Sequence, residues 1–144
     1  MDKKYLISII GKQNVDNQET ETKLVAPCDY QFKNNNVYIS YEEYDNSENG
    51  KKSLSTIKID NTSMVTLLRQ GAQSTKLTLE KGKRHLCHYS TEFGDTMIGI
   101  FTHDINCKFS ENNCKIMLNY AIDVNTEHLS MNNVIIEVKE NKNV

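Results

Sequence analysis

The sequence is poor in proline and arginine, and it lacks an apolar run long enough to cross a membrane as a helix. Of its 144 residues one is proline and none is tryptophan, and only Arg69 and Arg84 are arginines. Lysine without arginine is poorly suited to paired hydrogen bonds with bases or phosphates. The net charge of -2 supplies no general attraction for phosphate backbones or anionic lipids. These absences argue against nucleic acid and membranes as partners.

Cysteine is also sparse, and its four positions carry no mark of an exported, disulfide-linked protein. The apolar segment after Lys3 and Lys4 is short, contains Ser8 and meets Lys12 without a cleavage site. It therefore predicts a first strand rather than a secretory signal. Isolated thiols among strand-like residues are usually small buried hydrophobes. We expect reduced cysteines and a cytoplasmic protein.

A metal site is the first alternative for several cysteines and histidines that lie in one third of the chain, namely His85, Cys87, His88, His103, Cys107 and Cys114. Cys87 and His88 are adjacent, so they point to opposite faces of a strand. Cys107 and Cys114 are further apart than the paired cysteines of a zinc knuckle. The spacing favours buried thiols and partly exposed histidines, and we expect neither a metal nor another cofactor.

Alternation with a period of two is the main pattern that the sequence does have. Val37, Ile39, Tyr41 and Glu43 fall on one face, with polar residues between them. The same alternation recurs in Ser55-Ile57-Ile59, Val65-Leu67-Arg69, Leu77-Leu79, Ile116-Leu118-Tyr120-Ile122 and Val134-Ile136-Val138. Clusters of Asn, Asp and Gly separate these runs and are typical of hairpin turns; they lie at 34–36, 46–50, 60–61, 71, 81–82, 94–95, 111–113 and 125.

This pattern predicts an all-β protein with about eight to ten antiparallel strands. Short connections favour an up-and-down barrel, and a two-sheet sandwich is the alternative. We expect one domain over residues 1–140 and a frayed tail over 141–144. Pro27 lies in the mostly polar segment 18–32, where it indicates an edge position, a bulge or a break between two strands.

Two charges interrupt the apolar faces and mark the candidate site. Glu43 continues the face of Tyr41, and Arg69 continues the face of Val65 and Leu67. Inside a barrel these charges need each other or a ligand, because an unpaired buried charge is costly. They could form a salt bridge at one barrel end, or lie at strand ends that are open to water. Tyrosine and threonine hydroxyls would extend a ligand site, which gives the predicted set Tyr41, Glu43, Arg69, Tyr89, Thr91 and Tyr120.

Several of these residues also carry a resemblance to a known family. The order and spacing of Tyr41-Glu42-Glu43, Ile57-Lys58-Ile59, Val65 with Arg69 and Gly71, Tyr89-Ser90-Thr91-Glu92-Phe93-Gly94 and Leu118-Asn119-Tyr120 resemble the YwiB-like proteins over most of the chain. That bacterial family has no known function and is described as having a calycin-like β-barrel. The resemblance implies a lipocalin-like closed barrel with room for a cavity, in a bacterial cytoplasm, and it implies no activity.

Three functions remain open at this point. The first is a non-enzymatic protein that binds a small, partly apolar or anionic ligand in the barrel, with Arg69 as the anion anchor. The second is a structural or interaction module, such as a homodimer, that uses Tyr5 and Tyr38 on its outer faces. The third is an enzyme with His88 or Glu43 as general base. No signature motif of an enzyme occurs, so we expect no catalytic residue.

Overall fold

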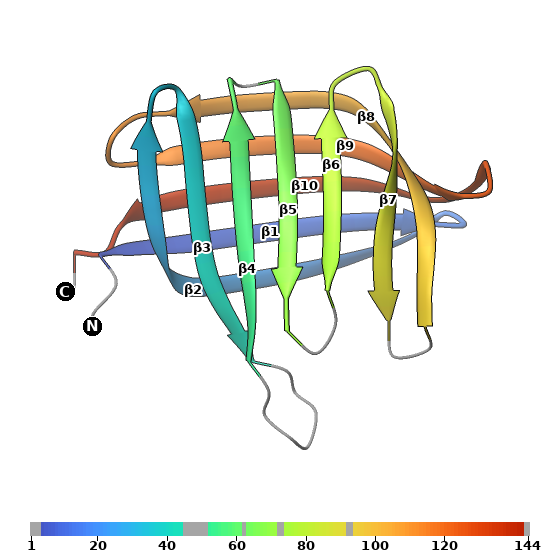
Figure 1. Ribbon diagram of the computed structural model, residues 1–144, viewed down its shortest axis with the longest axis horizontal. Coiled ribbons are helices and arrows are strands. Elements are labelled where there is room, and N and C mark those ends of the chain that lie inside the picture. Colours follow the sequence, from blue (N-terminus) through green and yellow to red (C-terminus); the bar gives the residue numbers. More distant parts are fainter. Residues whose placement is uncertain (1–3, 45–51, 62, 72–73, 92–93, 143–144) are drawn as a thin grey trace.

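The computed structural model describes residues 4–44, 52–61, 63–71, 74–91 and 94–142, which form a closed antiparallel β-barrel (Figure 1). Its strands are β1 (Tyr5–Val15), β2 (Gln18–Lys33), β3 (Asn36–Tyr44), β4 (Lys52–Asp60), β5 (Met64–Gln70), β6 (Thr75–Glu80), β7 (Arg84–Thr91), β8 (Gly94–Phe109), β9 (Cys114–Val124) and β10 (Glu127–Glu140). Each strand pairs with its neighbours in sequence, and β1 pairs with β10. The prediction of an all-β, up-and-down barrel is confirmed.

Asparagine supplies the backbone geometry of several hairpin turns. Asn34, Asn35, Asn61 and Asn125 have positive φ angles, which asparagine tolerates better than most residues. These turns were predicted from the sequence, whereas the turn at Asp16 and Asn17, between β1 and β2, was not. The predicted turn at 46–50 and residues 143–144 of the predicted tail lie outside the described residues.

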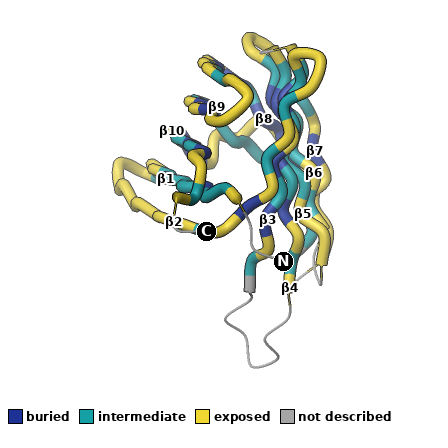
Figure 2. The backbone as a smooth tube through the Cα atoms, turned by 90° about the vertical axis from the view of Figure 1, so that its left-hand side faces the viewer, coloured by how far each residue is buried: buried dark blue, intermediate teal, exposed yellow. Residues whose placement is uncertain are grey.

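The barrel consists of two layers whose strands cross. Strands β3 to β7 run steeply through the front of Figure 1, and β1, β9 and β10 run across behind them. Figure 2 shows the same two layers from the side. The two longest strands, β2 and β8, join the layers: β2 pairs with β1 as far as Cys28 and with β3 from Asp29. Likewise β8 pairs with β7 through Phe101 and with β9 from Gly99.

Pro27 lies just before the point at which β2 changes partner. It is opposite Leu6 of β1, and the pairing with β3 begins only at Asp29. The second side of β2 has no strand neighbour from Gln18 to Pro27, within the described part of the chain. Proline lacks an N–H group and is tolerated where that side of the strand is free. The edge interpretation of Pro27 is correct, although β2 itself is continuous.

Apolar rows from both layers fill the middle of the barrel. Val37, Ile59, Val65 and Leu79 are directly opposite one another on successive strands, and all four are fully buried. From the other layer, Ile7, Ile136, Val138 and Ile116 are also buried, among further residues of the same core. The predicted inward faces of β3, β4, β5, β9 and β10 are thus confirmed.

Aromatic side chains close one corner where the layers diverge. The rings of Phe32 and Phe109 lie 5.4 Å apart, and those of Tyr5 and Tyr30 lie 5.3 Å apart. Tyr30 Oη donates a hydrogen bond of 2.6 Å to the Ser110 carbonyl, which ties β2 to the β8–β9 turn. The expectation of an exposed Tyr5 is therefore wrong, because this ring is partly buried against Tyr30 and the core.

A glycine on β8 leaves room for an ion pair on the outer surface. Arg84 Nε and Nη2 donate hydrogen bonds of 3.0 and 2.6 Å to the two carboxylate oxygens of Asp123. This bidentate pair raises the pKa of Arg84 and lowers the pKa of Asp123. Gly99 lies between their strands, opposite Asp123. A Cβ atom there would lie only 2.6 Å from Arg84 Nε and from Asp123 Oδ2.

We predict that Gly99→Ala lowers the free energy of unfolding by about 1–3 kcal/mol, because the added methyl group displaces the Arg84–Asp123 pair. Urea denaturation followed by circular dichroism measures this loss. Gly11→Ala is the matched control, since its Cβ would meet only the rotatable Thr22 Oγ1, at 3.1 Å. Equal stability losses in the two variants would contradict the close packing of Arg84 over Gly99.

Candidate functional site: a cavity at one corner of the barrel

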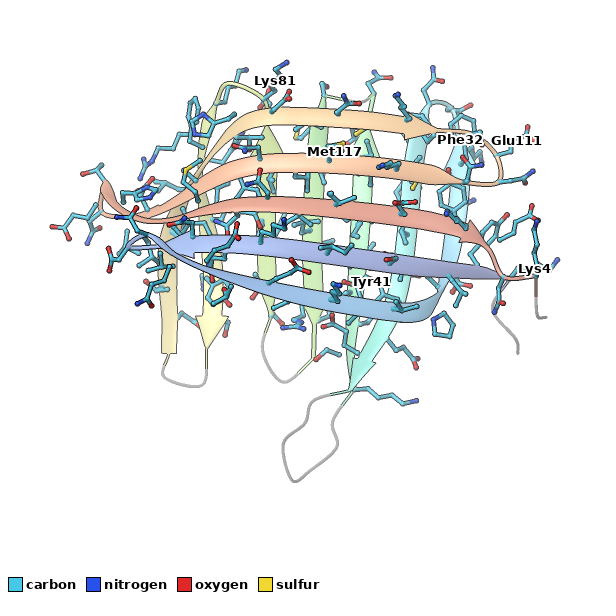
Figure 3. All side chains as sticks on the ribbon, turned by 180° about the vertical axis from the view of Figure 1, so that it is seen from behind. Lys4, Phe32, Tyr41, Lys81, Glu111 and Met117 are labelled. Carbon is cyan, nitrogen blue, oxygen red and sulfur yellow. The ribbon has the colours of Figure 1, made fainter. Side chains whose placement is uncertain are left out.

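A row of polar residues crosses the inner face of the front layer, one residue from each of five strands. Each member pairs directly with the next one across neighbouring strands, and the row consists of Tyr41, Ser55, Arg69, Thr75 and Tyr89. Two rows further along the strands, the corresponding positions are the fully buried Val37, Ile59, Val65 and Leu79. The inner face therefore changes from apolar to polar toward one end of β3 to β7. Tyr41, a member of this row, is labelled in Figure 3, where its label stands between the ribbons of β1 and β2 in the view from behind.

Glu43 joins this polar row from one step further along β3. Arg69 Nη2 donates a hydrogen bond to Glu43 Oε2, so the two charges that interrupt the apolar faces pair with each other. The side chain of Glu43 is 18% exposed and that of Arg69 is 49% exposed. Both residues are next to last in their strands. The sequence offered two interpretations of these charges, a salt bridge at one barrel end and a location at strand ends open to water. Both apply, because the ion pair lies at strand ends that water reaches.

The polar row borders a cavity of about 240 Å³. Below the row, Ile57, Leu67 and Leu77 form an apolar wall, and they are directly opposite one another on β4, β5 and β6. Ile9 of β1 and Ile136 of β10 contribute from the other layer. The cavity therefore has apolar walls from both layers and one polar rim, a composition typical of small-molecule sites.

Four of the six predicted site residues line this cavity, namely Tyr41, Glu43, Arg69 and Tyr89. Burial raises the pKa of Tyr41, and this effect outweighs the opposite effects of its hydrogen bond to Ser55 and of the Arg69 charge. The side chain of Tyr41 is thus neutral at physiological pH and can donate or accept a hydrogen bond. Thr91 ends β7 opposite Gly94, and its side chain lies outside the described part of the structure.

Tyr120 lies beside the cavity rather than among its lining residues. It is buried on β9 between Thr102 and Asn132, its direct neighbours on β8 and β10. Burial raises the pKa of Tyr120 to about 12, and the influence of Tyr89, a member of the polar row, raises this pKa slightly further. Asn132 Nδ2 donates to Ser130 Oγ at 3.0 Å, whereas the buried Thr102 Oγ1 has no partner in the described structure. The second layer is therefore polar near this corner too.

Of the residues considered for acid–base catalysis or metal binding, Glu43 lines the cavity, whereas His88 and Cys87 do not. His88 Nε2 is 3.4 Å from Asp95 Oδ2, and both side chains are more than half exposed. Cys87 is buried, and its Sγ accepts a hydrogen bond of 3.4 Å from the Thr78 amide. Among the described residues, no group of three or more His, Cys, Asp or Glu side chains could hold a metal ion.

A larger hollow, of about 720 Å³, lies on the outside of the barrel near the end of β10. It is lined mainly by charged and amide side chains, including Lys108, Lys115, Glu137 and Lys139. Lys139 Nζ lies 3.6 Å from Glu137 Oε2, and the lysine side chain is 75% exposed. The interior cavity is smaller but has fixed apolar walls, so we take it as the candidate site.

Sequence reasoning missed Ser55 and Thr75, which complete the polar row. Ser55 belongs to the predicted inward face of Ile57 and Ile59, whereas Thr75 precedes the predicted run Leu77-Leu79 by one inward position. Small hydroxyl residues are common at strand ends, so neither position stands out by composition. Only the strand register shows that each lies directly opposite Arg69.

The comparisons with known proteins agree with this fold. A family model described as "Domain of unknown function (DUF1934)" matches residues 7–136. The chain is similar to a solved structure, described as the crystal structure of ywiB protein from Bacillus subtilis, with a TM-score of 0.83 and 20% sequence identity. The match covers 98% of this chain and 94% of that chain. The search of curated proteins found no match. Within the described residues, no helix has the length and apolar character needed to cross a membrane.

We predict that Tyr120 makes the protein less stable at alkaline pH. Its pKa is about 12 in the folded protein and about 10 in the unfolded chain. Its stabilising contribution is complete below about pH 10 and is lost as pH rises toward 12, because only the unfolded chain then releases the proton. The wild-type free energy of unfolding should therefore fall more steeply than that of Tyr120→Phe above about pH 10, by roughly 1 kcal/mol per pH unit.

Urea titrations at a series of pH values measure both slopes. Between about pH 7 and 9 the tyrosine is protonated in both states, so the two curves should run parallel there and serve as an internal control. Parallel curves above pH 10 as well would show that Tyr120 is not shielded from water.

Proposed function

The chain belongs to the DUF1934 family, and we propose that it is a binding protein that holds a small, partly apolar ligand in the cavity at the corner of the barrel. The convergence of Tyr41, Glu43, Arg69 and Tyr89 on one cavity carries the proposal. These residues come from three different strands, β3, β5 and β7, and meet only because of the register.

The walls of the cavity favour binding over catalysis. Ile57 and Ile136 are almost fully buried, so the apolar side of the cavity is held by the packed core. The rim offers charged and neutral hydrogen-bonding groups that can orient a ligand. Glu43, one of the two candidate bases, lies on this rim but is hydrogen-bonded to Arg69, and His88 is not among the lining residues, so the role we propose is non-enzymatic. The volume of about 240 Å³ is below the usual range for drug-sized ligands, which favours a smaller molecule.

We place this role in the cytoplasm, as the sequence predicts. The four cysteines support a reducing compartment, since all are free thiols, and Cys28, Cys87 and Cys114 are buried. Burial raises the pKa of Cys107 to about 11 and of Cys114 to about 12, which keeps both thiols protonated and unreactive.

We predict that isocaproate and isoamyl alcohol, two short aliphatic probes, bind saturably in the cavity. Methyl NMR should show shifts that concentrate on the lining residues Ile9, Leu67, Leu77 and Ile136. Leu77→Phe fills the apolar wall and should weaken binding of both probes at least about tenfold. Leu86→Phe is the matched control, because Leu86 is 65% exposed on the outer face. No saturable shift with either probe, or equal binding by Leu77→Phe, would contradict the proposal.

A second candidate role, self-association, is favoured by the free side of β2. Pro27 has no N–H group to donate to β1, so we infer that its nitrogen faces away from β1. The alternate residues Glu19, Glu21, Lys23 and Val25 share this strand orientation. Their backbone groups are thus available to a further strand. If a second copy pairs antiparallel about Thr22, Lys23 of each chain lies opposite Glu21 of the other, which gives two ion pairs. The homodimer expected from the sequence would then use β2.

The outer-face tyrosine on which the sequence argument relied is already partly engaged. Tyr38 is 38% exposed, and Lys58 Nζ lies 5.7 Å from the centre of its ring. Tyr38 therefore has an intramolecular partner of the cation–π type. The argument for a dimer rests on the edge of β2 and not on the tyrosines.

We predict that Glu21→Lys weakens dimerisation at least about tenfold, because it places lysines opposite each other twice in the proposed dimer. The double variant Glu21→Lys/Lys23→Glu restores both cross-strand pairs and should dimerise like the wild type. Sedimentation equilibrium over a series of protein concentrations measures the effect. A wild-type protein that stays monomeric at the highest concentration would remove this second role, and so would a failure of the double variant to recover.

A further inference from the structure

The charges at the cavity rim form a balanced pair. Arg69 and Glu43 are hydrogen-bonded to each other, and their formal charges sum to zero. An anionic ligand that draws Arg69 away would leave Glu43 without its partner, and a cationic ligand would do the same to Arg69. Each loss is costly where the charge is partly buried, as it is for Glu43. The pair therefore discriminates against ligands that carry a single charge.

Both members of the pair keep unused hydrogen-bonding capacity. The bond between them uses Nη2 of Arg69 and Oε2 of Glu43. A guanidinium group has five N–H donors, and a carboxylate has a second oxygen with its own lone pairs. A ligand carboxylate can accept hydrogen bonds from the remaining donors of Arg69, and a ligand ammonium can donate to Oε1 of Glu43. Such bonds between charged groups are the strong ones, and neither requires the existing ion pair to break.

The remaining walls of the cavity determine which uncharged part of a ligand fits. The Tyr41 hydroxyl already has a hydrogen-bond partner in Ser55, so the charged pair is the main polar feature that a ligand meets. The wall of Ile57, Leu67 and Leu77 offers only apolar contact. A cavity of about 240 Å³ suits a short aliphatic or branched chain. The charged end of the ligand then lies at the rim and its apolar end against the core.

We propose that the ligand is a small zwitterion, with an ammonium and a carboxylate group on a short aliphatic body, as in an aliphatic α-amino acid. This inference rests on the proposed binding function of the same cavity. It differs from the sequence-based expectation of Arg69 as an anchor for a lone anion, because Glu43 already occupies part of that anchor.

Three probes with the same branched aliphatic body test the charge preference. Leucine carries both charges, isocaproate lacks the ammonium, and isoamylammonium lacks the carboxylate. We expect leucine to bind the wild-type protein at least about tenfold more tightly than either analogue, as one additional charged hydrogen bond would produce. The affinities are measured by calorimetry and by the methyl NMR shifts of the lining residues.

Variants of the ion pair separate its role from that of the apolar wall. Glu43→Gln should reduce the affinity for leucine to about that for isocaproate, and Arg69→Gln should reduce it to about that for isoamylammonium. The double variant Glu43→Gln/Arg69→Gln leaves neither charge unpaired and should bind isoamyl alcohol as the wild type does. Lys76→Gln is the control for loss of a charge, since Lys76 is exposed on β6 outside the cavity.

The outcomes distinguish this inference from the proposed function. Binding of all three probes with equal affinity, or tightest binding of isocaproate, would overturn the zwitterion and leave the cavity as a binding site. Absence of binding by every probe, isoamyl alcohol included, would overturn both. A preference for leucine that persists in the double variant would show that other groups of the protein bind the charged groups of the ligand. It would overturn the role of the Arg69–Glu43 pair.

Discussion

The barrel closes because two strands of sixteen residues, β2 and β8, each belong to both layers. Each changes partner near its middle, so the layers join at two corners and diverge at the other two. At one diverging corner, Phe32 packs on Phe109 and Tyr30 is hydrogen-bonded to the β8–β9 turn. The candidate cavity is lined by other residues, which come from β3 to β7 and from β1 and β10. The length of two strands thus determines where the layers join, and the room for a ligand lies between these layers.

The composition of the rows explains why this room is not filled. Deeper in the barrel, branched aliphatic residues such as Val65 and Leu79 interdigitate and are fully buried. At the rim, Ser55 and Thr75 are small, and Arg69 extends toward Glu43 rather than into the core. A polar rim would lose hydrogen bonds to water if it collapsed onto the apolar wall. The same residues that keep the cavity open give it a polar end and an apolar end.

The period of two in the sequence was enough to find the charged and aromatic side chains that face inward. Tyr41, Glu43 and Arg69 could be predicted because each continues an apolar face. The first half of β2 could not, because both of its faces are exposed and no alternation remains. The inward face of β8 could not be predicted either, for a different reason. The irregularity between Thr102 and Asp104 shifts the buried, inward positions from even to odd residue numbers. The assembly of the site depends on register, which no single strand encodes.

The pairing of β1 with β10 brings the two ends of the described chain together, and Asn141 N donates a hydrogen bond of 2.6 Å to the Lys4 carbonyl. Every other strand pairing joins neighbours in sequence, so this ladder is the one long-range closure of the ring. A short linker between residues 4 and 141 would turn the chain into a continuous circle of hairpins. That circle can be cut at a different turn without altering any pairing, which makes the barrel a natural scaffold for circular permutation.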